Sequence, residues 1–116
     1  MQLQWCKASD GTWWQFDEVT PKQLDAYGVF VAWRNGSDVK VSTVLYVGRG
    51  SLRDEFARCR RDPLFRSEGV YVTWATVYDV RVLDSIAAYL YRELRPLWGE
   101  VVPLVPPLPV NLPLTA

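Results

Sequence analysis

The sequence contains no histidine, and its two cysteines, Cys6 and Cys59, do not form a CxxC pair. A structural zinc ion takes about four Cys, His or carboxylate ligands, so we expect no such site. Because isolated cysteines are usually buried and reduced inside cells, we predict two free thiols in a cytoplasmic protein rather than a disulfide.

Long apolar runs are also missing from the sequence. No stretch approaches the ~18 apolar residues of a membrane-spanning helix. Residues 1–7 lack the basic segment and apolar run of a secretory signal. We therefore expect a cytoplasmic location and no membrane partner.

The chain has no excess of either charge: 13 Lys and Arg balance 13 Asp and Glu. Non-specific nucleic-acid binding depends on a basic excess that neutralises phosphates, so this balance argues against strong indiscriminate DNA binding unless basic residues cluster locally. Hydrophobic residues, in contrast, make up 49% of the 116 residues, with six Trp, six Tyr and four Phe. This composition predicts one globular domain with an aromatic-rich core.

Hydrophobic periodicity and turn residues predict the order ββ-α-ββ-α-β-α, followed by a tail. The predicted elements are strands at 3–7 and 12–17, a short helix opened by Thr20-Pro21, strands at 28–33 and 39–47, a helix at 51–61, a strand at 69–78 and a helix at 82–95. Gly48 and Gly50 are expected to end the strand before them. This order predicts an α/β (α+β) fold with a small antiparallel three-stranded sheet flanked by helices.

We expect one domain, residues 1–116, with three parts. Residues 1–26 are predicted to form an N-terminal β-hairpin and a helix, and residues 27–100 to form the core. Residues 101–116 contain five prolines separated mainly by Leu and Val. Because proline cannot donate to a strand ladder, we expect an extended tail that packs on the core without regular pairing.

Four short segments carry a family resemblance. Gly28-Val29-Phe30 and Tyr46-Val47-Gly48 lie in successive predicted strands, Leu83-Asp84-Ser85-Ile86 opens a later helix, and Val110-Asn111-Leu112-Pro113 lies in the tail. In order and spacing they resemble the GIY-YIG nuclease family over residues 27–114. The resemblance implies metal-assisted hydrolysis of a DNA phosphodiester.

That chemistry uses a group that activates water, a cation that stabilises the phosphoryl oxygens, and a carboxylate that holds a divalent metal. The resemblance assigns these roles to two tyrosines, an arginine on the first helix, a glutamate on the second and a terminal asparagine. Tyr46 and Asn111 keep the second tyrosine and the asparagine. Phe30, Glu55 and Ala87 replace the first tyrosine, the arginine and the metal-binding glutamate.

The three replacements remove a hydroxyl, reverse a charge and delete a metal ligand. Losing one charge-stabilising donor costs roughly 10²–10³ in rate, so we expect little or no cleavage. No resident metal or small-molecule cofactor is predicted, and Mg²⁺ or Mn²⁺ would be needed only by an active domain. Arg53 and Arg58 are the nearest substitute cations, and Asp84 the nearest substitute carboxylate, although the helix dipole explains Asp84 better.

The remaining candidates each have a structural explanation as well. Tyr46 fits a solvated strand-end tyrosine, and Asn111 fits a buried amide that ties the tail to the core. Six basic residues, diluted by acidic ones, form either a phosphate-contacting surface or a solvated helix face. They are Arg49, Arg53, Arg58, Arg60, Arg61 and Arg66.

Three functions follow from these observations. The first is a catalytically degenerate GIY-YIG-like domain that acts in nucleic-acid binding or regulation. The second is an active, divergent endonuclease that uses Tyr46, Arg53 or Arg58, Asp84 and Asn111. The third is a protein-interaction or oligomerisation module, suggested by the neutral charge and by three N-terminal tryptophans, Trp5, Trp13 and Trp14. Because Trp13 and Trp14 are adjacent in a predicted strand, we expect them to face opposite sides of it.

Overall fold

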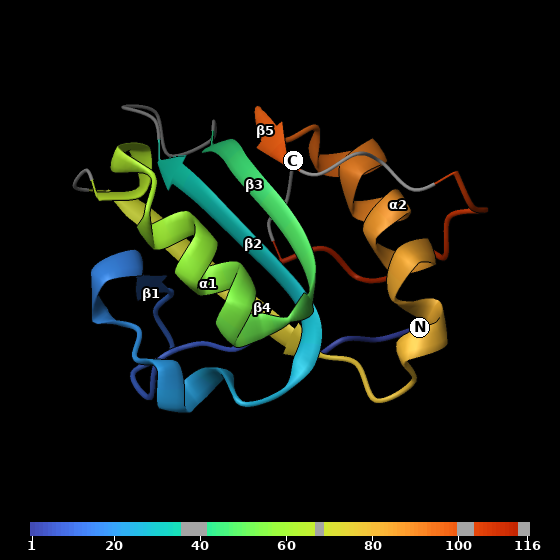
Figure 1. Ribbon diagram of the computed structural model, residues 1–116, viewed down its shortest axis with the longest axis horizontal. Helices are drawn as coiled ribbons and strands as arrows, with labels where there is room; N and C mark the ends of the chain where they lie inside the picture. Colours follow the sequence, from blue (N-terminus) through green and yellow to red (C-terminus); the bar gives the residue numbers. More distant parts are fainter. Residues whose placement is uncertain (36–41, 67–68, 100–103, 114–116) are drawn as a thin grey trace.

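The computed structural model describes residues 1–35, 42–66, 69–99 and 104–113. Its strands are β1 (Trp14–Gln15), β2 (Tyr27–Asn35), β3 (Ser42–Ser51), β4 (Val70–Thr76) and β5 (Trp98–Gly99). Its α-helices are α1 (Leu52–Arg60) and α2 (Leu83–Leu94), and the short 3₁₀ helices are η1 (Phe16–Glu18), η2 (Pro21–Leu24), η3 (Pro63–Arg66) and η4 (Val80–Val82). The fold is a mixed α+β sheet with helices, as the sequence predicts (Figure 1).

The sheet is wider than the predicted three strands. The expected antiparallel centre is present as β4, β2 and β3, but the full order is β1-β4-β2-β3-β5. β1 adds a fourth antiparallel strand through Trp14 and Val72, and β5 pairs in parallel with β3 through Trp98 and Tyr46. Both added strands have only two residues, too few for an alternating pattern to reveal them.

The predicted N-terminal hairpin is wrong. A turn does close between Ala8 and Thr12, but residues 3–7 form no strand and β1 pairs with β4 instead. The backbone N–H of Cys6 donates to the carbonyl of Trp74, and the backbone of Leu3 bonds to a side chain of the tail. The backbone of the N-terminal segment therefore finds its hydrogen-bond partners on the open edge of β4 and on the tail, and not in a hairpin.

The two α-helices cover opposite faces of the sheet (Figure 1). Because strand side chains alternate, Phe30 and Ala32 of β2 pack on the α1 side while Val29 and Val31 pack on the α2 side. Trp13 meets Trp33 edge to face, with ring centroids 5.4 Å apart, in the α2-side cluster. Trp14 stacks on Trp74 in the α1-side cluster, which confirms that the two adjacent tryptophans face opposite sides.

The predicted signals of the two longer helices are confirmed, whereas the helix opened by Thr20-Pro21 is only the short 3₁₀ helix η2. The Oγ of Ser51 accepts the backbone N–H of Asp54 at the start of α1, and α2 ends at Leu94, two residues before Pro96. β3, however, continues through Gly48 and Gly50 instead of ending before them, and the first part of the predicted 39–47 strand, residues 39–41, lies outside the described residues. None of the helices formed by the described residues combines the length and the apolar character needed to cross a bilayer.

Within the described part of the tail, residues 104–113, the second half packs on the core. Val110 is buried in the α2-side cluster, and Leu108 and Leu112 are partly buried against it. No residue of this segment belongs to a strand. The tail therefore contributes side chains to the core while its prolines stay out of the sheet.

Candidate functional site

Tyr46 and Glu55 form a buried polar pair between β3 and α1. The phenol of Tyr46 donates a hydrogen bond to Oε2 of Glu55. Glu55 is 3% exposed and Tyr46 is 6% exposed, so the pair is almost closed to solvent. Tyr46 is therefore not the solvated strand-end tyrosine that its sequence position also allowed.

Arg58 completes this cluster at its solvent side. Its Nη1 donates to the phenol oxygen of Tyr46 at 3.4 Å and lies 4.0 Å from Oε1 of Glu55. The side chain of Arg58 is 56% exposed, so water screens much of its attraction to Glu55. Arg58, which the sequence predicted as a substitute cation, thus lies on the solvent side of the Tyr46 and Glu55 pair and is not buried with it.

Gly48 makes the close approach of Glu55 to β3 possible. A Cβ at this position would lie 2.7 Å from a ring carbon of Tyr46 and still closer to Oε2 of Glu55. Real Cβ atoms do not come that near to other heavy atoms, so any larger residue would push the carboxylate or the ring aside. The sequence analysis did not predict the pairing of Tyr46 with Glu55. The signal for it was a glutamate on the buried face of the predicted helix, together with the Tyr-x-Gly segment of the preceding strand.

The other two altered family positions are fully buried and apolar. Phe30 packs edge to face with Phe56, with centroids 6.3 Å apart. Ala87 on α2 is 0% exposed. Among the described residues, no group of three or more His, Cys, Asp or Glu side chains is placed to hold a metal ion.

The substitute carboxylate Asp84 is engaged elsewhere. Its Oδ1 accepts from Nε of Arg49 at 2.6 Å, which joins the first turn of α2 to β3. Because strand side chains alternate, Arg49 and Val47 point to the α2 side of β3, whereas Tyr46 points to the α1 side. Asp84 and Tyr46, both named for an active nuclease, therefore lie on opposite faces of the sheet.

Asn111 joins the tail to the N-terminal segment. Its Nδ2 donates to the carbonyl of Leu3 at 2.9 Å, and its Oδ1 accepts the Leu3 N–H at 2.6 Å. The indole N–H of Trp5 donates to the Asn111 carbonyl at 2.9 Å. The side-chain amide thus pairs with the Leu3 backbone as a neighbouring strand would, and it holds the tail against the N-terminal segment.

Replacing Asn111 with alanine is expected to lower the free energy of unfolding by about 2 kcal/mol, because two partly buried backbone groups of Leu3 lose their partner. Urea denaturation followed by tryptophan fluorescence measures the change. Gln4→Ala, an exposed substitution in the same segment, is the control and should change stability by less than about 0.5 kcal/mol. Equal stability of the two variants would contradict the clamping role.

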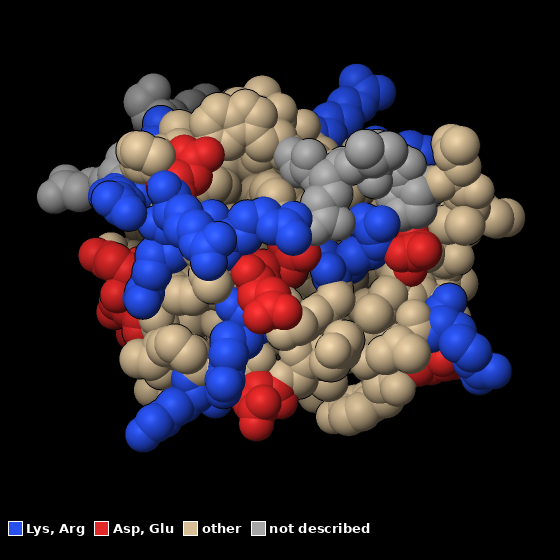
Figure 2. Space-filling view, in the orientation of Figure 1, with Lys and Arg blue, Asp and Glu red and all other residues tan. Residues whose placement is uncertain are grey.

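Basic side chains gather at the C-terminal end of α1 and in η3. Figure 2 shows them as a group that covers this part of the molecule, with acidic side chains nearby. The guanidinium of Arg60 lies 5.0 Å from the centroid of Phe56, and Nε of Arg66 donates to the carbonyl of Arg60. Arg58, Arg60, Arg61 and Arg66, all exposed, form what we call the basic surface.

The two remaining arginines of the predicted surface lie apart from this group. Arg49 faces α2 through its ion pair with Asp84. Arg53, in the first turn of α1, has an Nη2 that lies 3.9 Å from Oδ1 of Asp25. The structure therefore brings four of the six predicted basic residues together at one end of the helix.

Cys59 lies on the buried side of α1 and is 2% exposed. Burial, joined by the negative charge of Glu55 and opposed by Arg58, raises the pKa of its thiol to about 12. The thiol therefore keeps its proton near pH 7, and the protonated form is a poor nucleophile. Cys6, half-buried, also has a raised pKa because of burial, and both cysteines are free, as predicted.

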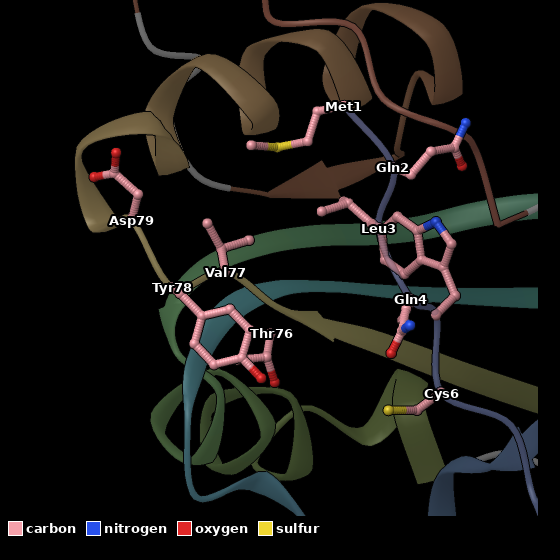
Figure 3. A pocket seen from close by; sticks show the side chains of 10 residues that line it. Met1, Gln2, Leu3, Gln4, Cys6, Thr76, Val77, Tyr78 and Asp79 are labelled. Carbon is pink, nitrogen blue, oxygen red and sulfur yellow. The ribbon is translucent and has the colours of Figure 1, made fainter.

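A separate hollow of about 690 Å³ lies between the N-terminal segment and the end of β4 (Figure 3). Residues 1–6 and 76–79 line it. Trp5, one of the three tryptophans that suggest a protein-interaction module, is among them, whereas none of the predicted nuclease or basic-surface residues is. No sequence motif predicts this hollow, because two segments far apart in the chain, residues 1–6 and 76–79, form it together.

Comparison of the chain with protein-family models, with curated proteins and with solved structures finds no match. The resemblance to GIY-YIG nucleases therefore rests on the four sequence segments. The candidate site is best described by its own chemistry: a buried carboxylate bound to a phenol, with Arg58 at its solvent side.

Proposed function

We propose that this chain is a GIY-YIG-like domain with a degenerate active site that binds nucleic acid without cleaving it. The observation that carries the proposal is the burial of Glu55 against the phenol of Tyr46, where the resembled family has an arginine. A carboxylate at that place repels a phosphate that the family arginine would hold. The phenol is also occupied, because it already bonds to the carboxylate.

The fully buried Ala87 supports the same conclusion. In the resembled family this helix position carries the glutamate that binds the divalent metal. A methyl group has no ligand atom, and the nearest carboxylate on α2, Asp84, is paired with Arg49. Phe30 lacks the hydroxyl of the first motif tyrosine, so three parts of the hydrolytic machinery are missing together.

The basic surface is the feature that fits nucleic-acid binding. Its four arginines are exposed at one end of α1, although the whole chain is neutral. Arginine suits phosphate contacts because its planar guanidinium presents several N–H donors. Such contacts position a nucleic acid and make its affinity depend on salt.

Cleavage is tested by incubating the purified chain with supercoiled DNA and Mg²⁺ or Mn²⁺. We expect no nicked or linear product above a no-protein control. Metal-dependent nicking that persists through purification, and that Tyr46→Phe abolishes, would instead support the divergent endonuclease.

Binding is tested with the Arg58→Ala variant and a fluorescent DNA duplex over a range of salt concentrations. Losing one phosphate contact should weaken binding and lower the slope of log K against log salt by about 1. Arg81→Ala is the matched control, because Arg81 is exposed but paired with Asp79, away from the basic surface. Binding that is absent, or that both variants weaken equally, would argue against this surface.

A further inference from the structure

A proline-rich stretch of the tail, Leu104–Pro109, exposes apolar side chains to solvent. Leu104 is 102% exposed and Val105 is 37% exposed, and the three prolines that follow also face solvent. Figure 1 shows this stretch projecting beyond α2 at the edge of the molecule. Nothing in the proposed nucleic-acid binding uses it, because residues 104–113 carry no charged side chain for a phosphate.

The backbone of this stretch is restricted by its own sequence. Pro106, Pro107 and Pro109 have φ held near −65° by their rings. Val105, Pro106 and Leu108 each precede a proline, which disfavours the helical region and favours an extended conformation. Every residue from Val105 to Pro109 is therefore a proline or precedes one, which favours polyproline II or closely related geometry, and the chain bends at Leu104 and Val105, just before Pro106.

The protein also holds this stretch in place. The N–H of Leu108 donates to the carbonyl of Ser85 on α2 at 2.9 Å, and the terminal amine of Met1 donates to the carbonyl of Pro109 at 3.3 Å. Val110, immediately afterwards, is buried in the α2-side core. Anchoring at one end means that little conformational entropy is left to lose when a partner binds.

We infer that Val105–Pro109 is a ligand for a protein domain that recognises polyproline II segments through a groove lined with aromatic side chains. A polyproline II helix has about three residues per turn, so Pro106 and Pro109 lie along one edge. Two prolines at this spacing are what such grooves accept. Both are exposed, whereas Leu108 between them is half-buried and points the opposite edge toward the core.

This inference is independent of nucleic-acid binding and goes beyond it. Packing of the tail on the core explains Val110 and Leu112, which lie in or against the α2-side cluster. It does not explain why Pro106, Pro107 and Pro109 are exposed together, with the exposed Val105 before them. A neutral aromatic groove complements this uncharged surface, and a phosphate backbone does not.

The test uses the full chain and purified SH3, WW and EVH1 domains as probes. Binding is followed by the fluorescence of the groove tryptophans and by isothermal titration. We expect at least one probe to bind, and the Pro106→Ala/Pro109→Ala double variant to bind it about tenfold or more weakly. Pro113→Ala, in the same tail but outside the stretch, is the matched control and should bind as the wild-type chain does.

Thermal unfolding by circular dichroism confirms that the variants remain folded. In the ¹⁵N-labelled chain, the amide signals of Val105 and Leu108 should shift on binding, a readout that does not depend on the substitutions. The inference is overturned if no probe binds, or if binding is unchanged in the double variant, or if the shifts map to another surface. Loss of DNA binding by Arg58→Ala would leave it standing.

Discussion

Ala87→Glu, which introduces the metal-binding glutamate of the resembled family, is expected to lower the free energy of unfolding by at least about 4 kcal/mol, because it places a carboxylate at a fully buried position. Burying an ion without a partner costs several kcal/mol, and the larger side chain also overpacks the space between α2 and the sheet. Urea denaturation measures the loss, and the variant should show no DNA cleavage in Mg²⁺.

Ala57→Glu provides the matched control for this substitution. Ala57 lies on the exposed side of α1, so the same chemical change there should alter stability by no more than about 0.5 kcal/mol. A stable Ala87→Glu variant that binds Mn²⁺ would show that α2 can open its buried face to a metal. That outcome would remove one main reason for regarding the domain as inactive.

Glu55→Ala is expected to lower the free energy of unfolding by about 3 kcal/mol, because it leaves a cavity and takes away the acceptor of the buried Tyr46 phenol. The Tyr46→Phe variant and the double variant complete a thermodynamic cycle. The cycle should give a coupling energy of about 1–3 kcal/mol between the two side chains, since they are in direct contact.

The matched control is Glu93→Ala on α2, whose glutamate is 39% exposed and forms a surface ion pair with Arg92. It should cost less than about 1 kcal/mol. A coupling energy near zero between Tyr46 and Glu55 would mean that the hydrogen bond adds nothing to folding. The pair would then be a poor basis for the proposal that the site is closed.

Much of the secondary structure could be predicted from the sequence, because its signals are local. The alternation of β2 and β3, the Ser51 cap of α1 and the stop of α2 before Pro96 depend on neighbouring residues alone. Two-residue strands and a hairpin are different, because their existence depends on which backbone edge is free. The N-terminal segment forms hydrogen bonds with the edge of β4 and with the Asn111 amide instead of pairing with a return strand of its own.

The candidate site was predicted in part. Sequence reasoning marked Tyr46, Glu55 and Arg58 separately, and identified the acid at Glu55 as unfavourable for a phosphate. Sequence reasoning did not predict that these three side chains meet. Tyr46 lies on a strand and the other two on the following helix, and their spacing in the sequence does not show in which direction each side chain points. It also treated Arg49 and Arg53 as members of the basic surface, whereas their pairing with Asp84 and Asp25 places them elsewhere.

The sequence by itself determined which atoms this domain has for chemistry: no histidine, no hydroxyl at Phe30, and no carboxylate at Ala87. It also determined the restricted backbone of the proline-rich stretch, since ring closure and pre-proline sterics act within neighbouring residues. Only the tertiary structure decided that Glu55 bonds to Tyr46, that Asn111 ties the two ends together, and that Leu104 stays outside. The physical reason is that hydrogen bonding and burial depend on distances between residues remote in sequence, which the packing of the whole chain sets.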